Sequence, residues 1–588
     1  MEEKKVLLSV QDLVVKFKVR GRSLTAIRGI SLDIYDGESI AIVGESGSGK
    51  SVFTKTFANM LDSNGYVDSG KIIFNDPDLA EVTLDVGHKE DVRMTSIRLK
   101  LDAYSKLEHG ADTYKAMKAL EAEKKAKASI SDEEDETFQE KLADLRFERA
   151  ETFNHKQTLD SHEKDKMKEA AAKISALDKQ IEAVEEERKK AQQEKAKAAA
   201  ADTAYNEAYA RKMADLKEQY RKEISGAITL EQHTRNVNLA KEIYLSVGRY
   251  DVVSRNKMIR KLLKCCREAM RQGLDMDSDE VGNDVFSAVT FRVKLEDEAE
   301  NRLFGRCVLD LANIKYSKDL TQIRGKKIAT VFQDPMTSLN PIITIGQQIT
   351  SIILKHQHCS EAEARIRAME LMKKVGIPNA ENRFDDYPFQ YSGGMRQRIV
   401  IAIALSCQPK ILICDEPTTA LDVTIQAQIL KLIKDLQKEF GYTIVFITHD
   451  LGVVANIADR VAVLYAGQIV ELGTVEDVFY DPRHPYTWAM LSSLPQLAQR
   501  NTELYSITGT PPSLYNKIVG DPFAPRNPYC LKIDTLQDAP MFKVSDTHYA
   551  KTWLLDPRAP KIEKPEIICN LHEKLVEAFN ISKEVMLL

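Results

Sequence analysis

A glycine-rich segment carries the clearest chemical potential in this chain. It reads Gly44-Glu45-Ser46-Gly47-Ser48-Gly49-Lys50-Ser51. The segment follows the apolar run Ser39–Val43 and precedes a helical stretch that begins at Val52, which is the context of a phosphate-binding loop. Glycines let the backbone curl so that successive N–H groups and the helix N-terminus face anionic phosphates. We expect Lys50 to contact the β- and γ-phosphates and the Ser51 hydroxyl to coordinate Mg²⁺.

An acidic pair, Asp415-Glu416, is the second candidate site. It follows the apolar run Ile411–Cys414, which predicts a buried strand. The pair therefore lies at the carboxyl edge of a sheet, where nucleotides bind in α/β folds. We expect Asp415 to hold Mg²⁺ through water and Glu416 to orient and polarise the water that attacks the phosphate. Beside a phosphate-binding loop, the pair predicts nucleotide hydrolysis.

A third segment resembles the signature sequence of ABC-transporter ATPases. It reads Tyr391-Ser392-Gly393-Gly394-Met395-Arg396-Gln397-Arg398. Further matches to that family are Gln333 (Q-loop), Leu421-Asp422 (D-loop), His449 (switch histidine) and Phe17, placed like the aromatic residue that stacks on adenine. The resemblance implies that Glu416, His449 and Gln333 are catalytic and that Ser51, Gln333 and Asp415 bind the metal. ATP and Mg²⁺ are the implied ligands.

The signature implies a partner, because it offers a second phosphate cradle that this chain's own loop does not need. In the family, two such domains sandwich two ATP molecules head to tail. Each signature, here Ser392, Gly393 and Gly394 with Asp422 nearby, completes the partner's site. The chain has one set of these motifs, so the resemblance implies a second ABC ATPase subunit.

Longer matches narrow the family. The segments Arg324–Pro341, Thr418–Leu430, Asp481–Thr487 and Leu491–Pro495 resemble the oligopeptide and dipeptide permease ATPases. The resemblance covers about residues 5–78 and 320–555. It implies peptide import at the cytoplasmic face of the cell membrane, with a second ATPase, two permease subunits and an extracytoplasmic peptide-binding protein. The sequence does not identify the transported peptides, because the binding protein and the membrane subunits select them.

One departure concerns a cofactor. The subfamily often carries cysteines near its C-terminus that hold an iron–sulfur cluster. Asp521 and Asn527 stand at those positions here, and Cys530 is out of register. Because such clusters need several thiolate ligands together, no iron–sulfur cluster is expected.

The elements that position these motifs predict an α/β fold, a P-loop ABC-type nucleotide-binding domain with a RecA-like core, an antiparallel β subdomain and a helical subdomain. A long insertion interrupts it, since no proline occurs between Pro77 and Pro335 and residues 111–225 also lack glycine. Apolar stripes at helical spacing predict two helices that pack on each other as a coiled-coil hairpin. The stripes are Met167, Ile174, Leu177, Ile181, Val184 and Tyr205, Tyr209, Met213, Leu216, Tyr220, Ile224.

The expected divisions are 1–79 (first part of the core), 80–319 (insertion), 320–480 (second part) and 481–588 (C-terminal extension). Within the insertion, alternation at Val289–Val293 predicts a strand. The insertion has no phosphate loop, metal set or nucleophile, so we expect an arm that contacts a further protein or the complex itself.

The overall charge argues against nucleic-acid binding. The 83 basic and 88 acidic residues give a net charge of −5, so no nucleic-acid partner is expected.

Other classes of ABC protein fit the motifs less well. Chromosome-maintenance and DNA-repair ABC ATPases are similar in having helical arms, but their arms leave the core after the Q-loop, whereas this insertion ends before Gln333. Adjacent Cys265-Cys266 also lack the spacing of a zinc hook. A translation-type protein would carry two cassettes, and a degenerate cassette would usually have lost Glu416 or His449. No apolar run approaches the roughly 20 residues that span a bilayer, so membrane association is expected through partners.

Overall fold

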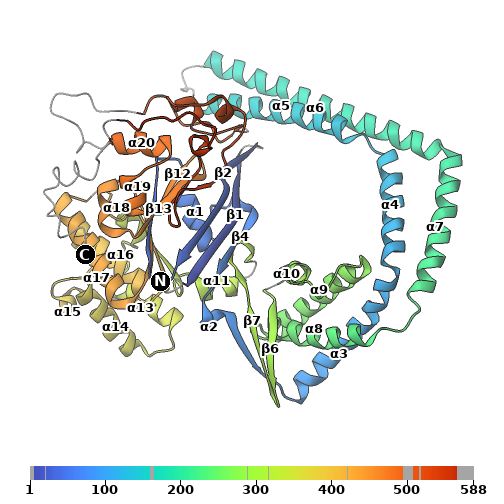
Figure 1. The fold of residues 1–588 in the computed structure, drawn as a ribbon, viewed down its shortest axis with the longest axis horizontal. Helices are drawn as coiled ribbons and strands as arrows, with labels where there is room; N and C mark the ends of the chain where they lie inside the picture. Colours follow the sequence, from blue (N-terminus) through green and yellow to red (C-terminus); the bar gives the residue numbers. More distant parts are fainter. Residues whose placement is uncertain are drawn as a thin grey trace. The chain divides into compact units, whose positions relative to one another are not determined.

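The computed structural model describes residues 5–19, 22–158, 164–287, 289, 291–314, 317–419, 421–493, 507–515, 518–565 and 568. The chain divides into two compact units (Figure 1). Unit 1 comprises Met1–Phe17, Leu24–Asn75 and Asp310–Leu588. Unit 2 comprises Lys18–Ser23 and Asp76–Leu309.

An eight-stranded sheet forms the centre of unit 1. Its order is β14 (Phe542–Lys543), β15 (Tyr549–Ala550), β13 (Gln468–Thr474), β12 (Arg460–Tyr465), β3 (Ser39–Val43), β11 (Thr443–Ile447), β10 (Ile411–Asp415) and β9 (Ile328–Val331). The five strands from β12 to β9 are parallel to one another. All residues of β3 and β11 are buried, as expected for parallel strands covered on both faces. The strands predicted at 39–43 and 411–414 are thus confirmed, and their carboxyl ends share one edge.

A second, four-stranded sheet has the order β2 (Arg22–Tyr35), β1 (Val6–Val19), β4 (Gly65–Phe74) and β8 (Leu309–Asp310). Strands β1 and β4 are antiparallel, and Phe17 lies opposite Gly65. The Asp310 carboxylate accepts a hydrogen bond from the Ile72 N–H at 2.9 Å. This contact and the pairing of β8 tie Asp310 to unit 1.

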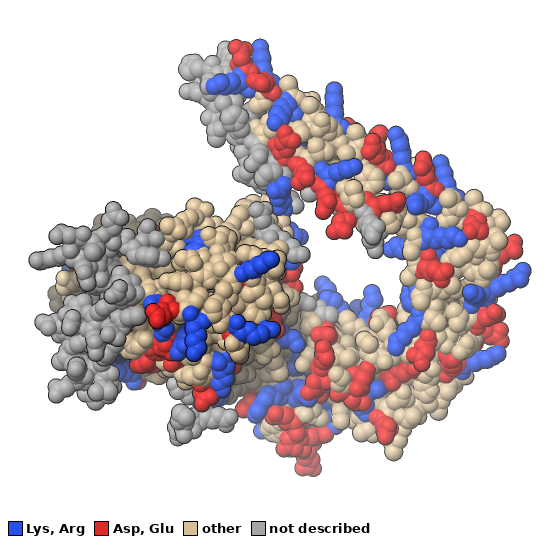
Figure 2. Space-filling model, turned by 45° about the horizontal axis from the view of Figure 1, so that its top comes forward, with Lys and Arg blue, Asp and Glu red and all other residues tan. Residues whose placement is uncertain are grey.

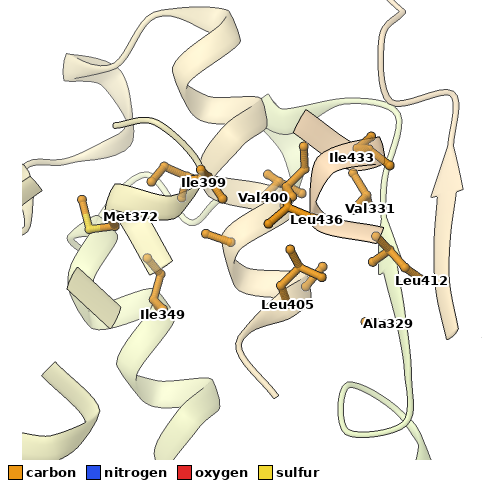
Figure 3. Close-up of a cluster of buried hydrophobic side chains, with 14 of the residues drawn as sticks. Ala329, Val331, Ile349, Met372, Ile399, Val400, Leu405, Leu412, Ile433 and Leu436 are labelled. Carbon is orange, nitrogen blue, oxygen red and sulfur yellow. The ribbon is translucent and has the colours of Figure 1, made fainter. Parts of the chain in front are cut away.

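Unit 1 also contains eleven α-helices among the described residues, of which α16 begins within the signature segment. They are α1 (Lys50–Phe57), α11 (Ser317–Ile323), α12 (Pro335–Ser338), α13 (Ile345–His356), α14 (Glu361–Lys374), α15 (Ala380–Arg383), α16 (Gly393–Leu405), α17 (Val423–Phe440), α18 (Leu451–Ile457), α19 (Val475–Tyr480) and α20 (Pro485–Ser492). An apolar core joins α13, α14, α16 and α17 to β9 and β10 (Figure 3). Ile349, Ile399 and Val331 are fully buried in it. This packing fixes α16 relative to β10, the strand that ends at the acidic pair.

The long segment of unit 2 contains α2 (Pro77–Ala80) and a three-stranded sheet of order β5 (Glu81–Asp85), β7 (Arg302–Cys307) and β6 (Val293–Ala299). Helix α8 (Leu230–Val247) packs on this sheet, α3 (His88–Ser105) and α9 (Val252–Arg271) pack on α8, and α10 (Asp279–Ser287) packs on α9. The strand predicted at 289–293 is wrong, because the ladder starts only at Val293. The Val289 N–H instead donates to the Phe286 carbonyl at 2.9 Å, which closes a turn after α10.

Four helices form two pairs within unit 2. Helix α5 (Asp132–Thr158) packs on α6 (Lys164–Ala201), and α4 (Ala111–Lys127) packs on α7 (Thr203–Glu223). Ion pairs from Lys195 to Glu134 and from Lys173 to Glu148 show that α5 and α6 are antiparallel. The predicted hairpin of the two striped helices is therefore wrong in its partners: the stripes lie on consecutive helices, α6 and α7, and each packs on an earlier helix.

Helix caps explain why these helices are interrupted. The Asp202 carboxylate accepts from the Tyr205 N–H at 3.1 Å and starts α7, and the Ser131 hydroxyl accepts from the Glu134 N–H at 3.2 Å near the start of α5. The longest of the four, α6, has 38 residues, or about 57 Å at 1.5 Å per residue. Figure 2 shows Lys and Arg interspersed with Asp and Glu along these helices, as on a solvated surface. None of the described helices has the length and apolar character to span a bilayer.

Candidate functional site

The glycine-rich loop connects β3 to α1. Gly44 has a φ of +152°, and a Cβ there would lie 2.1 Å from the Leu464 carbonyl oxygen. Gly47 and Gly49 have φ values of +80° and +103°. These conformations favour glycine, and Gly49 caps α1. The loop thus presents its backbone at the N-terminus of a helix, as anion-binding loops do.

Lys50 is held within this loop. Its Nζ donates to the carbonyl oxygens of Gly44 and Glu45 at 2.8 and 2.9 Å. Burial lowers the pKa of Lys50, while the nearby carboxylates of Glu416 and Asp415 oppose that shift. An ammonium group in a loop with several backbone N–H donors is suited to phosphate.

Ser51 and Asp415 meet although they are far apart in sequence. The Ser51 hydroxyl donates to Asp415 Oδ1 at 2.9 Å. Burial raises the pKa of Asp415, the hydrogen bond from Ser51 lowers it, and the charge of Glu416 raises it. A hydroxyl and a carboxylate oxygen at this distance are the hard oxygen ligands that Mg²⁺ prefers, so the pair fits the expected metal.

Glu416 is the meeting point of three other side chains. Gln333 Nε2 donates to its Oε2 at 2.8 Å, the Thr419 hydroxyl donates to Oε2 at 3.1 Å, and His449 Nδ1 lies 3.2 Å from Oε1. Gln333 follows β9 and His449 follows β11, and these two strands are the neighbours of β10. The three parallel strands therefore place Gln333, His449 and Glu416 at one edge of the sheet. Glu416 has a φ of +45°, and such strain costs about 1–3 kcal/mol and clusters at active sites.

The remaining predicted residues lie on other elements. Ser392 caps α16, accepting from the Met395 N–H at 3.4 Å, and Asp422 caps α17, accepting from the Ile425 N–H at 3.0 Å. Over the described ranges, no hydrogen bond of either side chain reaches the 44–51 loop. The ring of Phe17 packs against Gly65, where a Cβ would lie 2.6 Å from it.

At the positions of the family's cluster cysteines, two polar side chains stabilise local turns. The Asp521 carboxylate accepts from the Phe523 N–H at 2.9 Å, and Asn527 Oδ1 accepts from the Tyr529 N–H at 2.9 Å. Burial raises the pKa of Asp521 to about 6. Both side chains therefore hold the backbone two residues further along the chain.

Two groups of residues are not predictable from the sequence motifs. Thr419 stands in the segment that resembles the permease ATPases, but its hydroxyl only gains a role through its contact with Glu416. Arg526 and Tyr486 both contact Glu45 from the C-terminal extension. No pattern within the sequence joins them to the loop.

Comparisons with known proteins agree with the motifs. The family model "ABC transporter" matches residues 27–248 and 299–419, and the model "Oligopeptide/dipeptide transporter, C-terminal region" matches 470–533. The oligopeptide transport ATP-binding protein AmiE of Streptococcus pneumoniae is 67% identical over 268 residues, which are 46% of this chain and 76% of that protein. OppD of Bacillus subtilis, also an oligopeptide transport ATP-binding protein, is 60% identical over 45% of this chain and 74% of its own length.

A dipeptide transport ATP-binding protein, DppD of Lactococcus lactis, is 58% identical over 45% of this chain and 75% of its own length. Among solved structures, a dimeric bacterial ABC transporter cassette aligns with a TM-score of 0.37 and 15% identity over 80% of this chain and 98% of that one. This weak likeness adds nothing to the family assignment. The profile matches and the relatives together confirm the resemblance: the chain belongs to the ABC transporter family, as an ATP-binding, ATP-hydrolysing subunit of the oligopeptide and dipeptide type.

Proposed function

We propose that this chain pairs with a second ABC ATPase subunit to drive import of oligopeptides or dipeptides through two permease subunits at the cytoplasmic face of the membrane. An extracytoplasmic binding protein would deliver the peptide. One observation carries the proposal: Ser51 meets Asp415, and Gln333 and His449 converge on Glu416, at a single edge of the sheet. The substrate class follows the relatives named above, which act in peptide transport.

In this proposal the backbone of residues 44–51 and Lys50 hold the phosphates of ATP, and Phe17 stacks on adenine. Ser51, Asp415 and Gln333 hold Mg²⁺. When bound, the metal neutralises phosphate charge. Burial of Lys50 and Asp415 supports these roles, because a partly desolvated site strengthens each electrostatic contact.

Glu416 is the proposed base that orients and polarises the attacking water. His449 steadies the carboxylate through Nδ1, 3.2 Å from Oε1, and its side chain is 64% exposed, so a ligand can reach it. Gln333 contacts the other carboxylate oxygen and links the base to α12 and the helices that follow. The arrangement supplies positioning and charge, which are what a protein contributes to phosphoryl transfer.

The signature is proposed to complete the partner's site. A Cβ at Gly393 would meet nothing within 4 Å of this chain, so packing within the chain does not require glycine there. Close approach of another molecule to the N-terminus of α16 gives a reason for it. ATP would favour the closed pair and hydrolysis would reopen it, which shifts a conformational equilibrium.

The region 342–376 is the proposed contact with the permease. Exposed apolar side chains lie in and beside it: Ile342 is 80% exposed and Met336 is 62% exposed. Phe389, 71% exposed, lies nearby, because Arg396 contacts both Met336 and the Pro388 carbonyl. Closure of the ATPase pair would pull on the membrane subunits through this surface.

Affinity purification from the native membrane tests the assembly. The tagged chain is expected to bring down two permease-like membrane proteins and a second ABC ATPase at equal stoichiometry, measured by quantitative mass spectrometry. A Met336→Asp, Ile342→Asp variant tests the proposed contact surface. It should lose the permease subunits while keeping ATP binding. Ribosomal or DNA-associated partners without a permease would contradict the import proposal.

The insertion is proposed to be an arm that binds a protein and performs no chemistry. Within the part of the chain that the structure describes, no three His, Cys, Asp or Glu side chains are placed to hold a metal ion. Its two ends are neighbours, because Glu81 pairs with Arg306 and the Cys307 thiol contacts the Leu79 carbonyl at 3.4 Å. A short turn can therefore replace it.

Deleting 82–305 and joining Glu81 to Arg306 through Asn-Gly-Asn-Gly is expected to leave the ATP dissociation constant within about threefold of wild type, by calorimetry. A cooperative thermal transition should show that the shortened chain is folded. A folded deletion variant that cannot bind ATP would show that the arm contributes to the nucleotide site.

A further inference from the structure

We propose that Arg526 is a positioning residue for the phosphate-binding loop, through which the C-terminal extension sets nucleotide affinity. It does so by neutralising and holding the Glu45 carboxylate. The inference rests on ATP binding by the 44–51 loop and does not depend on which substrate is transported. Its basis is a set of contacts that none of the motif assignments uses.

Arg526 binds the Glu45 carboxylate through two hydrogen bonds. Its Nη1 and Nη2 donate to the two carboxylate oxygens at 2.8 and 3.0 Å, the geometry of a bidentate pair. The guanidinium is held in turn, because Nη1 also donates to the Tyr465 hydroxyl at 3.1 Å and Nε donates to the Thr508 carbonyl at 3.0 Å. Only 6% of the Arg526 side chain is exposed, so its orientation is fixed by its surroundings.

The same extension also holds the backbone of Glu45. The Glu45 N–H donates to the Tyr486 hydroxyl at 2.8 Å, and Tyr486 is fully buried. The rings of Tyr486, Tyr465 and Phe523 form a cluster with centroids 4.5 to 5.4 Å apart, which fixes that hydroxyl. Both ends of one loop residue are thus attached to elements outside the loop.

A cavity beside the loop shows the same association. Its walls comprise Glu45, Ser46, Gly47 and Ser48 from the loop together with Tyr465, Ala466, Pro511, Pro512 and Leu514. Residues 511–514 therefore lie against the loop on the side of the extension. The conformation of the loop between β3 and α1 therefore depends on contacts from the C-terminal extension as well as on its own glycines.

The charge of Glu45 explains why its ion pair with Arg526 matters for nucleotide binding. Glu45 is the second residue of a loop that must accept a triphosphate, and a free carboxylate there would repel it. Arg526 neutralises that charge by pairing with the Glu45 carboxylate, whose side chain is 28% exposed. Losing Arg526 leaves an unpaired anion beside the phosphates, whereas losing both charges removes the repulsion.

The test compares a single and a double variant of the full-length chain, with ATP affinity measured by calorimetry. Arg526→Gln is expected to weaken ATP binding about tenfold, and Glu45→Gln with Arg526→Gln to restore it to within about threefold of wild type. Arg526→Lys keeps the charge but loses the fork, and should bind about threefold more weakly. Arg558→Gln, at an exposed arginine of the same extension, is the matched control and should bind normally.

Thermal unfolding distinguishes two roles of Arg526: positioning the phosphate-binding loop, or only stabilising the fold of the C-terminal extension. Both Arg526→Gln and the double variant lose the ion pair, so their unfolding temperatures should fall together while their affinities differ. Equal loss of affinity in the two, or wild-type affinity in Arg526→Gln, would overturn the proposal. If Arg526→Gln does not fold, wild-type affinity in Arg526→Lys would overturn it.

In the membrane-embedded complex, Arg526→Gln should raise KM for ATP about tenfold with kcat within twofold, because it alters binding and not the base. Equal loss in kcat would contradict a positioning role. Since ATP affinity is measured without permease subunits, an error in the import assignment leaves the outcome of this test unchanged.

Discussion

Replacing Glu416 by glutamine is expected to reduce ATP hydrolysis by about 10²- to 10⁴-fold, the range typical of a lost general base. Glutamine has nearly the same shape and can still contact Gln333 and Thr419, but it cannot take a proton from water. ATP binding should therefore remain. The measurements are phosphate release in the membrane-embedded complex and ATP affinity of the isolated chain.

Glu476→Gln is the control for this variant. Glu476 is an exposed residue in the first turn of α19, so the same chemical change there should leave hydrolysis within about twofold. Hydrolysis that survives Glu416→Gln unchanged would remove Glu416 from the role of base. His449 and Gln333 would then converge on a carboxylate that takes no proton from the attacking water.

Replacing Gly393 by aspartate is expected to reduce hydrolysis about 100-fold without weakening the fold. A Cβ at this position meets nothing within 4 Å, and a carboxylate in the first turn of α16 interacts favourably with the helix dipole. Thermal stability should thus be unchanged or slightly raised. The loss would come from repulsion between the new carboxylate and the phosphates of an ATP molecule held by the partner ATPase.

Two comparisons sharpen this test. Thr229→Asp places a carboxylate at the N-terminus of α8 in unit 2, and hydrolysis should be unaffected by it. ATP affinity of the isolated Gly393→Asp chain should match wild type, because its own loop is not altered. Weaker ATP binding by the isolated chain, or full hydrolysis in the complex, would contradict a signature that acts across a subunit interface.

The local part of the site can be predicted because each motif is a short strand with polar residues at its end. β3 precedes the glycine loop and β10 precedes Asp415-Glu416, and apolar runs alone place both strands. Parallel strands align their carboxyl ends, so convergence of loop and acidic pair is also predictable. Gln333 and His449 need the family resemblance, since a lone glutamine or histidine after a strand has no distinctive local pattern.

The helical insertion shows where pattern reasoning fails. An apolar stripe on a helix identifies the face that is buried but not the helix that covers it, because many stripes are equally complementary. The sequence pattern therefore pairs the stripes of α6 and α7 with each other, whereas α5 and α4 cover them in the fold. Ser131 and Asp202, which cap α5 and α7, are the available signals for the interruptions.

The sequence by itself determined the nucleotide chemistry of this protein, because strand, loop and helix of such a site are contiguous and their backbone geometry is local. Only the tertiary structure decided what holds that site in place. Arg526 reaches the Glu45 carboxylate across 481 residues of sequence, and Tyr486 reaches the Glu45 N–H across 441. Contacts at such separations arise from packing of the whole fold, which no local propensity or periodicity encodes.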